Sequence, residues 1–317
     1  MPSHSYLGHR IYFELDGPAG APVMVFINGL TQATRHWAGY RDYFTGHGYR
    51  VLTYDLLGQG DSSKPVLGLG FDDNTDVLRE LMDALEIDKA FVGGISFGGI
   101  IVLKFGIKYG ERLHGIVPMS TFSQMDAQLY KIGTNLYQGM ARVGFEYLVD
   151  LFTSYNFSDR WIAANADAIP GIKRASSSIN DLYAIQNLME SITHFEGFTD
   201  ELDRIRCPTL IMNGEFDALT PRRYHELLRQ RIGNSRLLLM QHVFHAFTLE
   251  IPEITCRVLR DFMEQVLEGR WQGDQSVWIA NDDPQGEPLM FPCPGDHTRA
   301  IPVAPVSAAA VKSIKTG

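Results

Sequence analysis

The stretch Phe91-Val92-Gly93-Gly94-Ile95-Ser96-Phe97-Gly98-Gly99 decides the fold, because it places a serine at the centre of a Gly-x-Ser-x-Gly turn. An apolar β run precedes the serine, and a helical run from Ile100 to Tyr109 follows it. The glycines on either side of the serine allow a strand to reverse tightly into a helix, which forces Ser96 into a strained conformation with an exposed hydroxyl. We therefore take Ser96 as the candidate nucleophile. The alternative is a glycine-rich turn that only packs a helix on a sheet.

Short apolar runs alternate with amphipathic segments on both sides of this turn. The predicted strands are Val23–Ile27, Arg50–Tyr54, Ala90–Gly93, Gly115–Met119, Thr209–Met212 and Arg236–Met240. The predicted helices are Trp37–Phe44, Asn74–Leu85, Gly98–Tyr109, Pro221–Arg231 and Pro252–Leu267. This alternation predicts an α/β fold with a mostly parallel sheet and right-handed crossovers. We expect Arg10–Leu15 to add an antiparallel edge strand.

The alternation stops after Ser120 and resumes at Thr209, which indicates an insertion. The intervening residues are helical in spacing and rich in aromatic side chains. We therefore expect an α/β core made of residues 1–120 and 205–268, with a helical lid at residues 121–204. Residues 269–317 turn to Asp, Gly and Pro, which predicts an irregular tail that cannot form a core. Two tryptophans and a phenylalanine in it leave open whether the tail docks as a strap or stays free.

Composition and charge restrict the classes of partner. The chain has 317 residues, is 45% hydrophobic and carries a formal net charge of -9, which is typical of a globular protein with a substantial core. Nucleic acid and anionic membrane surfaces need basic patches, so we expect neither as a partner. No apolar run approaches the roughly 20 residues that span a bilayer, and the first ten residues lack the apolar centre of a signal peptide. These features predict a cytoplasmic protein that acts on a small molecule.

The cysteines and glycines show no sign of a cofactor. Cys207, Cys256 and Cys293 are odd in number and widely spaced, which fits neither a disulfide framework nor paired zinc ligands, so we expect reduced thiols. There is no phosphate-binding Walker loop and no dinucleotide-binding Gly-x-Gly-x-x-Gly after a strand. We expect neither a metal nor an organic cofactor.

Polar residues follow two late strands at the points where these strands end. The segment Asn213–Asp217 comes after one strand, and Gln241–His245 comes after the next. Because ligands of open α/β sheets gather at the carboxyl ends of the strands, both segments are expected to converge on Ser96. A serine needs a histidine as base and a carboxylate to orient that histidine.

Two positions compete for each of these roles. Asp217 or Glu215 can supply the acid, and His245 or His242 can supply the base. The chain order of serine, acid and histidine is that of an α/β hydrolase, and the sequence resembles this superfamily across roughly residues 10–267. The resemblance favours Asp217 and His245 and implies a carboxylesterase-like serine hydrolase.

Two further segments carry the resemblance. The run Arg206-Cys207-Pro208-Thr209-Leu210 leads to the acid strand, and His245 is followed by Glu250 and Pro252 at the usual spacing of the histidine loop. A serine nucleophile argues against haloalkane dehalogenase and epoxide hydrolase chemistry, which needs an aspartate in its place. The loop Gly58-Gln59-Gly60-Asp61-Ser62 resembles one that is widespread in the superfamily, and we expect it to shape the sheet edge without taking part in chemistry.

The resemblance also implies where the oxyanion of an acyl intermediate is bound. One donor is the N–H of Phe97, and the other is the N–H of Leu30 in the loop after Val23–Ile27. The sequence departs here from the commonest pattern, because Asn28 stands where a histidine usually precedes the glycine. The backbone donor survives this change, and the Asn28 side chain can brace the loop by hydrogen bonds.

The aromatic and methionine residues of the lid bear on the substrate. Most of them are expected to form the core of the lid, and some to line a pocket for an apolar acyl chain. We therefore expect hydrolysis of an ester or thioester through an acyl-enzyme on Ser96. Two alternatives remain open. One is acyl transfer to a hydroxyl group, because the lid and Ile27-Asn28-Gly29 are loosely similar to the acyltransferase that joins hydroxyacyl chains into rhamnolipid precursors. The other is a ligand-binding receptor or scaffold with little turnover.

Overall fold

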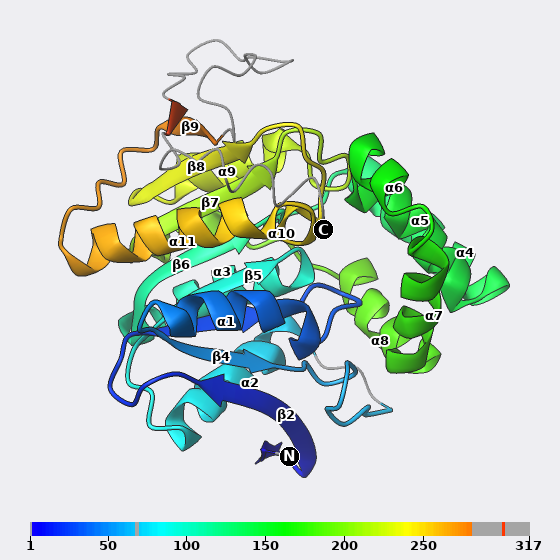
Figure 1. Cartoon of the computed structure of the whole chain (residues 1–317), viewed down its shortest axis with the longest axis horizontal. Coiled ribbons are helices and arrows are strands. Elements are labelled where there is room, and N and C mark those ends of the chain that lie inside the picture. Colours follow the sequence, from blue (N-terminus) through cyan, green and yellow to red (C-terminus); the bar gives the residue numbers. More distant parts are fainter. Residues whose placement is uncertain (1, 67–69, 281–299, 302–317) are drawn as a thin grey trace.

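A mostly parallel β sheet runs through the middle of the protein (Figure 1). The computed structural model describes residues 2–66, 70–280 and 300–301. Within these residues the sheet has ten strands in the order β1-β2-β4-β3-β5-β6-β7-β8-β9-β10. The strands are β1 Ser3–Tyr6, β2 His9–Asp16, β3 Val23–Ile27, β4 Arg50–Tyr54, β5 Ala90–Ile95, β6 Leu113–Met119, β7 Thr209–Gly214, β8 Ser235–Met240, β9 Val277–Ala280 and β10 Ala300–Ile301.

Helices cover both faces of this sheet. Those of the core are α1 Ala38–Gly46, α2 Phe71–Ala84, α3 Phe97–Lys108, α9 Arg222–Arg231, α10 Phe247–Glu250 and α11 Pro252–Leu267, with short 3-10 turns η1 Thr34–Trp37, η2 Gly110–Arg112 and η3 Thr199–Arg204. Figure 1 shows α1 and α11 side by side on the near face, with α2 and α3 behind the sheet. The predicted α/β-hydrolase fold is confirmed.

The burial of β3 explains why the central strands of this sheet are continuous apolar runs in the sequence. Met24 and Phe26 pack in the core cluster that contains residues of α1 and α11, whereas Val25 and Ile27 pack in the cluster that contains residues of α2 and α3. Successive side chains of a strand point to opposite faces, and both faces of this sheet are covered. All five residues of β3 are therefore buried.

The antiparallel strand near the N-terminus does not lie at the edge that we expected. The predicted Arg10–Leu15 lies within β2, which is antiparallel to β4 on one side and to β1 on the other. The edge is β1, whose sequence Ser-His-Ser-Tyr lacks a continuous apolar run. Such a strand is formed by pairing with its neighbour, so its own sequence does not predict it.

The insertion between β6 and β7 is helical, as predicted. It contains α4 Ala127–Val143, α5 Phe145–Asn156, α6 Asp159–Ala164, α7 Ile169–Ile179 and α8 Leu182–Thr193. Figure 1 shows these helices, in green, gathered beyond one end of the sheet. The limits 121–204 stay a prediction for the extent of the lid unit.

The chain after Gly269 differs from the irregular segment that we expected. The Trp271 ring packs edge-on against Phe262 of α11 at 4.8 Å, and β9 then pairs in parallel with β8. Val277 and Ile279 of β9 are each only 7% exposed, so apolar burial holds this short strand in the sheet. The prolines from Pro284 onward and Phe291 lie outside the described residues. Within the described part of the chain, no helix has the length and apolar character needed to cross a membrane.

Candidate active site

Ser96 lies at the turn between β5 and α3 in a strained backbone conformation. Its φ is 54° and its ψ is -114°, values that L-residues rarely adopt. The surroundings hold it there: its N–H donates to the Met119 carbonyl at 2.9 Å, and its carbonyl accepts from the Thr121 hydroxyl at 2.8 Å. The serine therefore stands at the junction of strand and helix, and it lines the pocket beneath the lid.

Close packing explains the glycines on either side of Ser96. A Cβ at Gly94 would lie 2.7 Å from the backbone of Gly98, and a Cβ at Gly98 would lie 2.6 Å from the carbonyl oxygens of Ile27 and Asn28. Real Cβ atoms do not approach other atoms so closely. These two positions need glycine because the start of helix α3 packs directly on β5, on the end of β3 and on the loop that follows β3.

His245 and Asp217 form a buried pair beside this turn. His245 Nδ1 lies 2.9 Å from Asp217 Oδ2, and the two side chains are 7% and 0% exposed. The loop after β7 supplies Asp217, and the loop after β8 supplies His245. Adjacent parallel strands end at the same edge of the sheet, which is why residues 28 apart in sequence meet here.

Hydrogen bonds surround the Asp217 carboxylate. Oδ1 accepts the N–H groups of Leu219 and Thr220 at 3.0 and 2.8 Å, and Oδ2 accepts the Thr220 hydroxyl at 2.8 Å and Asn213 Nδ2 at 3.1 Å. Burial alone would raise the pKa of Asp217, but the charge and hydrogen bond of His245 and the donors around the carboxylate outweigh it. The pKa of Asp217 therefore lies below its ordinary value, and the carboxylate is ionised at neutral pH.

The competing acid and histidine lie elsewhere. Glu215 accepts a hydrogen bond from the backbone N–H of His242 at 3.1 Å, and His242 itself is exposed with a φ of 59°. Neither residue lines the pocket that contains Ser96. The geometry thus joins Asp217 to His245 and separates Glu215 and His242 from both.

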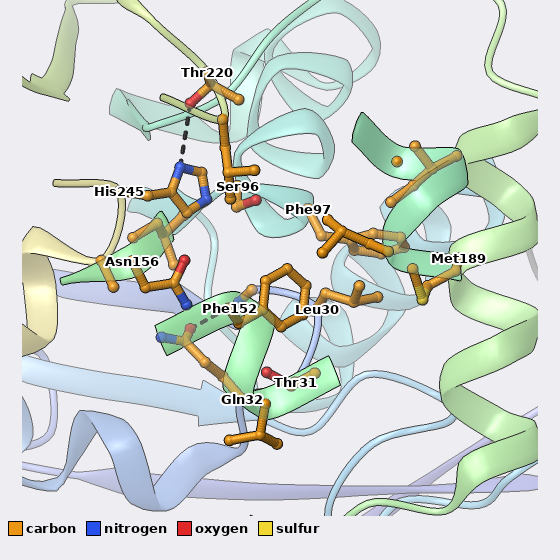
Figure 2. Close-up of a pocket in the computed structure, with 18 of the residues that line it drawn as sticks. Leu30, Thr31, Gln32, Ser96, Phe97, Phe152, Asn156, Met189, Thr220 and His245 are labelled. Carbon is orange, nitrogen blue, oxygen red and sulfur yellow. Dashed lines mark hydrogen bonds between the residues drawn. The ribbon is translucent and has the colours of Figure 1, made fainter. Parts of the chain in front are cut away.

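Figure 2 shows the imidazole of His245 close to Ser96 at one side of the pocket. Because Nδ1 is engaged by Asp217, the other ring nitrogen, Nε2, is free to serve the serine. Among the described residues, Ser96 Oγ and His245 Nε2 do not form a direct hydrogen bond. Catalytic hydrogen bonds are often long in structures without substrate and shorten when it binds.

The two predicted oxyanion donors lie on the same pocket as Ser96. Phe97 is the first residue of α3, so its N–H has no partner within the helix. Leu30 follows β3, and its N–H has no hydrogen-bond acceptor within the described residues. As expected from the sequence, Asn28 braces this loop: its Nδ2 donates to the Tyr54 carbonyl at 3.1 Å and its Oδ1 accepts from Trp37 Nε1 at 2.9 Å.

The pocket is a cavity of about 520 Å³ between the sheet and the lid. Apolar side chains from five lid helices, α4 to α8, line most of it. Of the lid aromatic and methionine residues considered above, those that reach the pocket are Phe122, Met125, Tyr130, Phe152, Phe157, Trp161 and Met189. The others do not: Tyr183, for example, is 74% exposed, and Met140 is fully buried in the core. Figure 2 places Met189 across the pocket from His245.

The lid is hydrogen-bonded to the loop that carries His245. The Asn156 carbonyl at the end of α5 accepts the N–H of Ala246 at 3.0 Å. The Ser158 N–H donates to Glu250 Oε2 at 3.2 Å, and the Ser158 hydroxyl donates to the other oxygen of the same carboxylate. Glu250, which the sequence singled out only by its spacing from His245, therefore links the lid to the histidine loop.

Sequence reasoning missed two residues of the site. Thr220 donates to Asp217 and lies 3.3 Å from His245 Nδ1, and Asn213 donates to the same carboxylate. A sequence signal for Thr220 was present in the run from Asp217 to Thr220. In such a turn the aspartate side chain accepts the backbone N–H groups of the residues that follow it.

The two cysteines within the described residues, Cys207 and Cys256, do not line the pocket that contains Ser96. The described residues contain no group of three or more His, Cys, Asp and Glu side chains that can hold a metal ion. Burial raises the pKa values of the Cys207 and Cys256 thiols to about 12, which leaves both unreactive at neutral pH. Cys293 lies outside the described residues.

The fold, the strained serine and the buried Asp-His pair define a hydrolase of the α/β class. The family model for the α/β hydrolase fold matches residues 22–252, and the chain belongs to this family.

Individual relatives extend over most of the chain. The 3-oxoadipate enol-lactonase 1 of Acinetobacter baylyi is 28% identical over 268 residues, which cover 82% of this chain and 95% of the relative. The proline iminopeptidase PfmaB of Pestalotiopsis fici is 24% identical over 281 residues, covering 81% and 97% of the two chains. The crystal structure of the enol-lactonase from Burkholderia xenovorans LB400 superposes with a TM-score of 0.76 at 21% identity, over 83% of this chain and 100% of that one.

Proposed function

We propose that this protein hydrolyses an ester or thioester of an apolar acyl group through an acyl-enzyme on Ser96. The observation that carries the proposal is one pocket that contains Ser96, His245 and both predicted oxyanion loops beneath an apolar lid. The proposed substrate is a small molecule. The cytoplasmic location rests on the sequence alone.

In the proposed reaction, Ser96 Oγ attacks the acyl carbonyl while His245 Nε2 takes its proton. Asp217 holds the imidazole and stabilises the imidazolium that forms. The backbone N–H groups of Leu30 and Phe97 donate to the carbonyl oxygen as it becomes negative. His245 then protonates the leaving alcohol or thiol, and a water activated by His245 releases the acid from Ser96.

The shape and lining of the cavity support the acyl preference. Its volume falls within the range of small-molecule pockets, and apolar side chains of the lid supply most of its surface. Burying one methylene contributes about 0.8 kcal/mol, so each added methylene should raise kcat/KM about 4-fold until the pocket is full. A lactone is a cyclic ester, so the name of the Acinetobacter relative is consistent with this reaction class.

The test begins with a fluorophosphonate probe, which labels activated serines without requiring a known substrate. Wild type is expected to be labelled at Ser96, and folded Ser96→Ala is expected to remain unlabelled and inactive. Wild-type protein is then assayed on p-nitrophenyl esters from acetate to decanoate. Activity highest on acetate would refute the apolar acyl preference, and a folded but unlabelled wild type would refute the hydrolase.

The same assay separates hydrolysis from transfer. Hydroxy fatty acids are added as acceptors, and the products are identified by mass spectrometry. Free acid as the sole product supports hydrolysis, whereas coupled esters would replace the proposal with acyl transfer.

A further inference from the structure

The loop that follows β4 reaches across to the loop that carries Leu30. The Gln59 side chain is fully buried, and its Nε2 lies 2.7 Å from the Gly29 carbonyl oxygen and 2.8 Å from that of Leu30. Both partners are carbonyl oxygens, which only accept hydrogen bonds. The contacting atom is therefore the amide NH2, and each of its two hydrogens is donated to one carbonyl.

Peptide geometry turns this contact into an orientation of the Leu30 N–H. The Gly29 carbonyl and the Leu30 N–H belong to one planar trans peptide and point in opposite directions. Gln59 draws the carbonyl toward the protein interior, so the N–H points the other way. Gly29 and Leu30 both line the pocket that contains Ser96, and this is the side on which an oxyanion would form.

Gln32 restrains the neighbouring peptide. Its Oε1 accepts the N–H of Gly29 at 2.8 Å, and its own backbone N–H donates to the Gly29 carbonyl at 3.2 Å. Figure 2 shows Gln32 and Leu30 together at the pocket wall. Gln59 joins this turn to residues 29 and 30 positions away, and Asn180 joins it to the lid by donating to the Thr31 carbonyl at 3.3 Å.

The loop that carries Gln59 is itself held in place. The buried carboxylate of Asp55 accepts the N–H of Asp61 at 2.8 Å from this loop and the N–H of Thr34 at 2.7 Å from η1. A Cβ at Gly60 would lie 2.1 Å from Asp55 Oδ2, so the loop wraps closely around the carboxylate. These contacts with Asp55 therefore hold the backbone of Gln59 in place.

We propose that Gln59 is a positioning residue for the oxyanion hole, acting through the Gly29-Leu30 peptide. This inference rests on the proposed function. It departs from the expectation that the loop Gly58–Ser62 only shapes the sheet edge. Because the Leu30 N–H would act mainly on the negative oxygen of the transition state, its loss should lower kcat and leave KM nearly unchanged.

The test replaces Gln59 with methionine, which has a similar length and no donor. Wild type and Gln59→Met are compared for kcat and KM on p-nitrophenyl butyrate, and for affinity toward a butyl trifluoromethyl ketone, which forms a tetrahedral oxyanion on the serine. Outright removal of an oxyanion donor costs about 100- to 1000-fold. A misdirected donor should cost less, so we expect kcat and ketone affinity each to fall about 10- to 100-fold, with KM within about 2-fold.

Ser235→Ala is the matched control. The Ser235 hydroxyl is also fully buried and donates to a backbone carbonyl, that of Ile232 at 2.6 Å, but it does not line the pocket. We expect this variant to lose stability in urea without losing kcat. If Gln59→Met behaves in the same way, Gln59 is only structural and the inference is overturned.

The outcomes also separate this inference from the proposed function. A wild type that the fluorophosphonate leaves unlabelled refutes the hydrolase, whereas a labelled wild type with an unchanged Gln59→Met kcat refutes only the role of Gln59. If Gln59→Met does not fold, Gln59→Leu is measured instead, because leucine is also apolar and has no donor. The same loss of kcat is expected, and an undiminished kcat overturns the inference.

Discussion

Replacing Asp217 with asparagine tests the identity of the acid. In the structure, Oδ1 accepts two backbone N–H groups, from Leu219 and Thr220, while Oδ2 accepts from Asn213 and from His245 Nδ1. An asparagine has only one oxygen. The two backbone donors require that oxygen at the Oδ1 position, which places the new NH2 group beside His245.

The consequence is a change of tautomer. An NH2 group at that place donates to Nδ1 of His245, so the ring must carry its proton on Nε2, where it cannot accept a proton from Ser96. In serine proteases the same exchange lowers kcat about 10⁴-fold, and we expect a similar loss. Asn213 Nδ2 loses one of its two acceptors but keeps the Thr220 carbonyl at 3.1 Å. We therefore expect a cost of about 1–3 kcal/mol in the free energy of unfolding.

The assay is kcat on p-nitrophenyl butyrate together with urea unfolding. Glu215→Gln serves as the matched control, because it changes the competing carboxylate two residues away, and its kcat should stay within about 2-fold of wild type. If Asp217→Asn keeps its activity while Glu215→Gln loses it, the assignment of the acid and the tautomer argument are both refuted.

Three further predictions concern pH, packing and chain length. Burial holds the pKa of His225 at about 4, so as the pH falls below 6.5 the unfolded chain takes up a proton first. The free energy of unfolding should be full above about pH 6.5 and lower by on the order of 3 kcal/mol at pH 4, a loss that His225→Gln should largely remove in urea titrations. Gly98→Ala should destabilise the fold by about 1–3 kcal/mol, because its Cβ would lie 2.6 Å from the Asn28 carbonyl, whereas Gly39→Ala has open space and should not; thermal unfolding of both would test this. Met189→Trp should fill the pocket and lower kcat/KM for octanoate about 10-fold or more while sparing acetate, and equal losses on both esters would contradict a role in acyl binding.

Elements were predicted correctly from the sequence where their own residues carry the pattern that forms them. The limits of β3 and β4 coincide with the predicted ones, because most of their residues are buried and apolar or β-branched and a polar residue follows each strand. The strands β1 and β9 were not predicted, since β1 is largely polar and β9 has only four residues. Pairing with β2 holds β1 and leaves little trace in its residues, whereas β9 is apolar and buried but too short for periodicity to show.

The residues of the candidate site also differ in how far the sequence alone identifies them. Ser96 could be recognised from its own turn, because the glycines around it are adjacent in sequence. His245 and Asp217 needed the family resemblance, since spacing alone left Glu215 and His242 as competitors. Thr220 and Gln59 escaped sequence reasoning, because each acts through hydrogen bonds to groups that only folding brings near.

By itself, the sequence determined the alternation of strands and helices in the core from β3 to β8, the turn at Ser96 and the helical character of the insertion, because hydrophobic periodicity and glycine sterics are local properties of the chain. Only the tertiary structure decided which carboxylate meets His245, which lid residues face the pocket, and that Gln59 contacts the Leu30 loop. These features depend on distances between segments far apart in the chain. Such distances are set by the packing of the whole sheet and its helices rather than by any one segment.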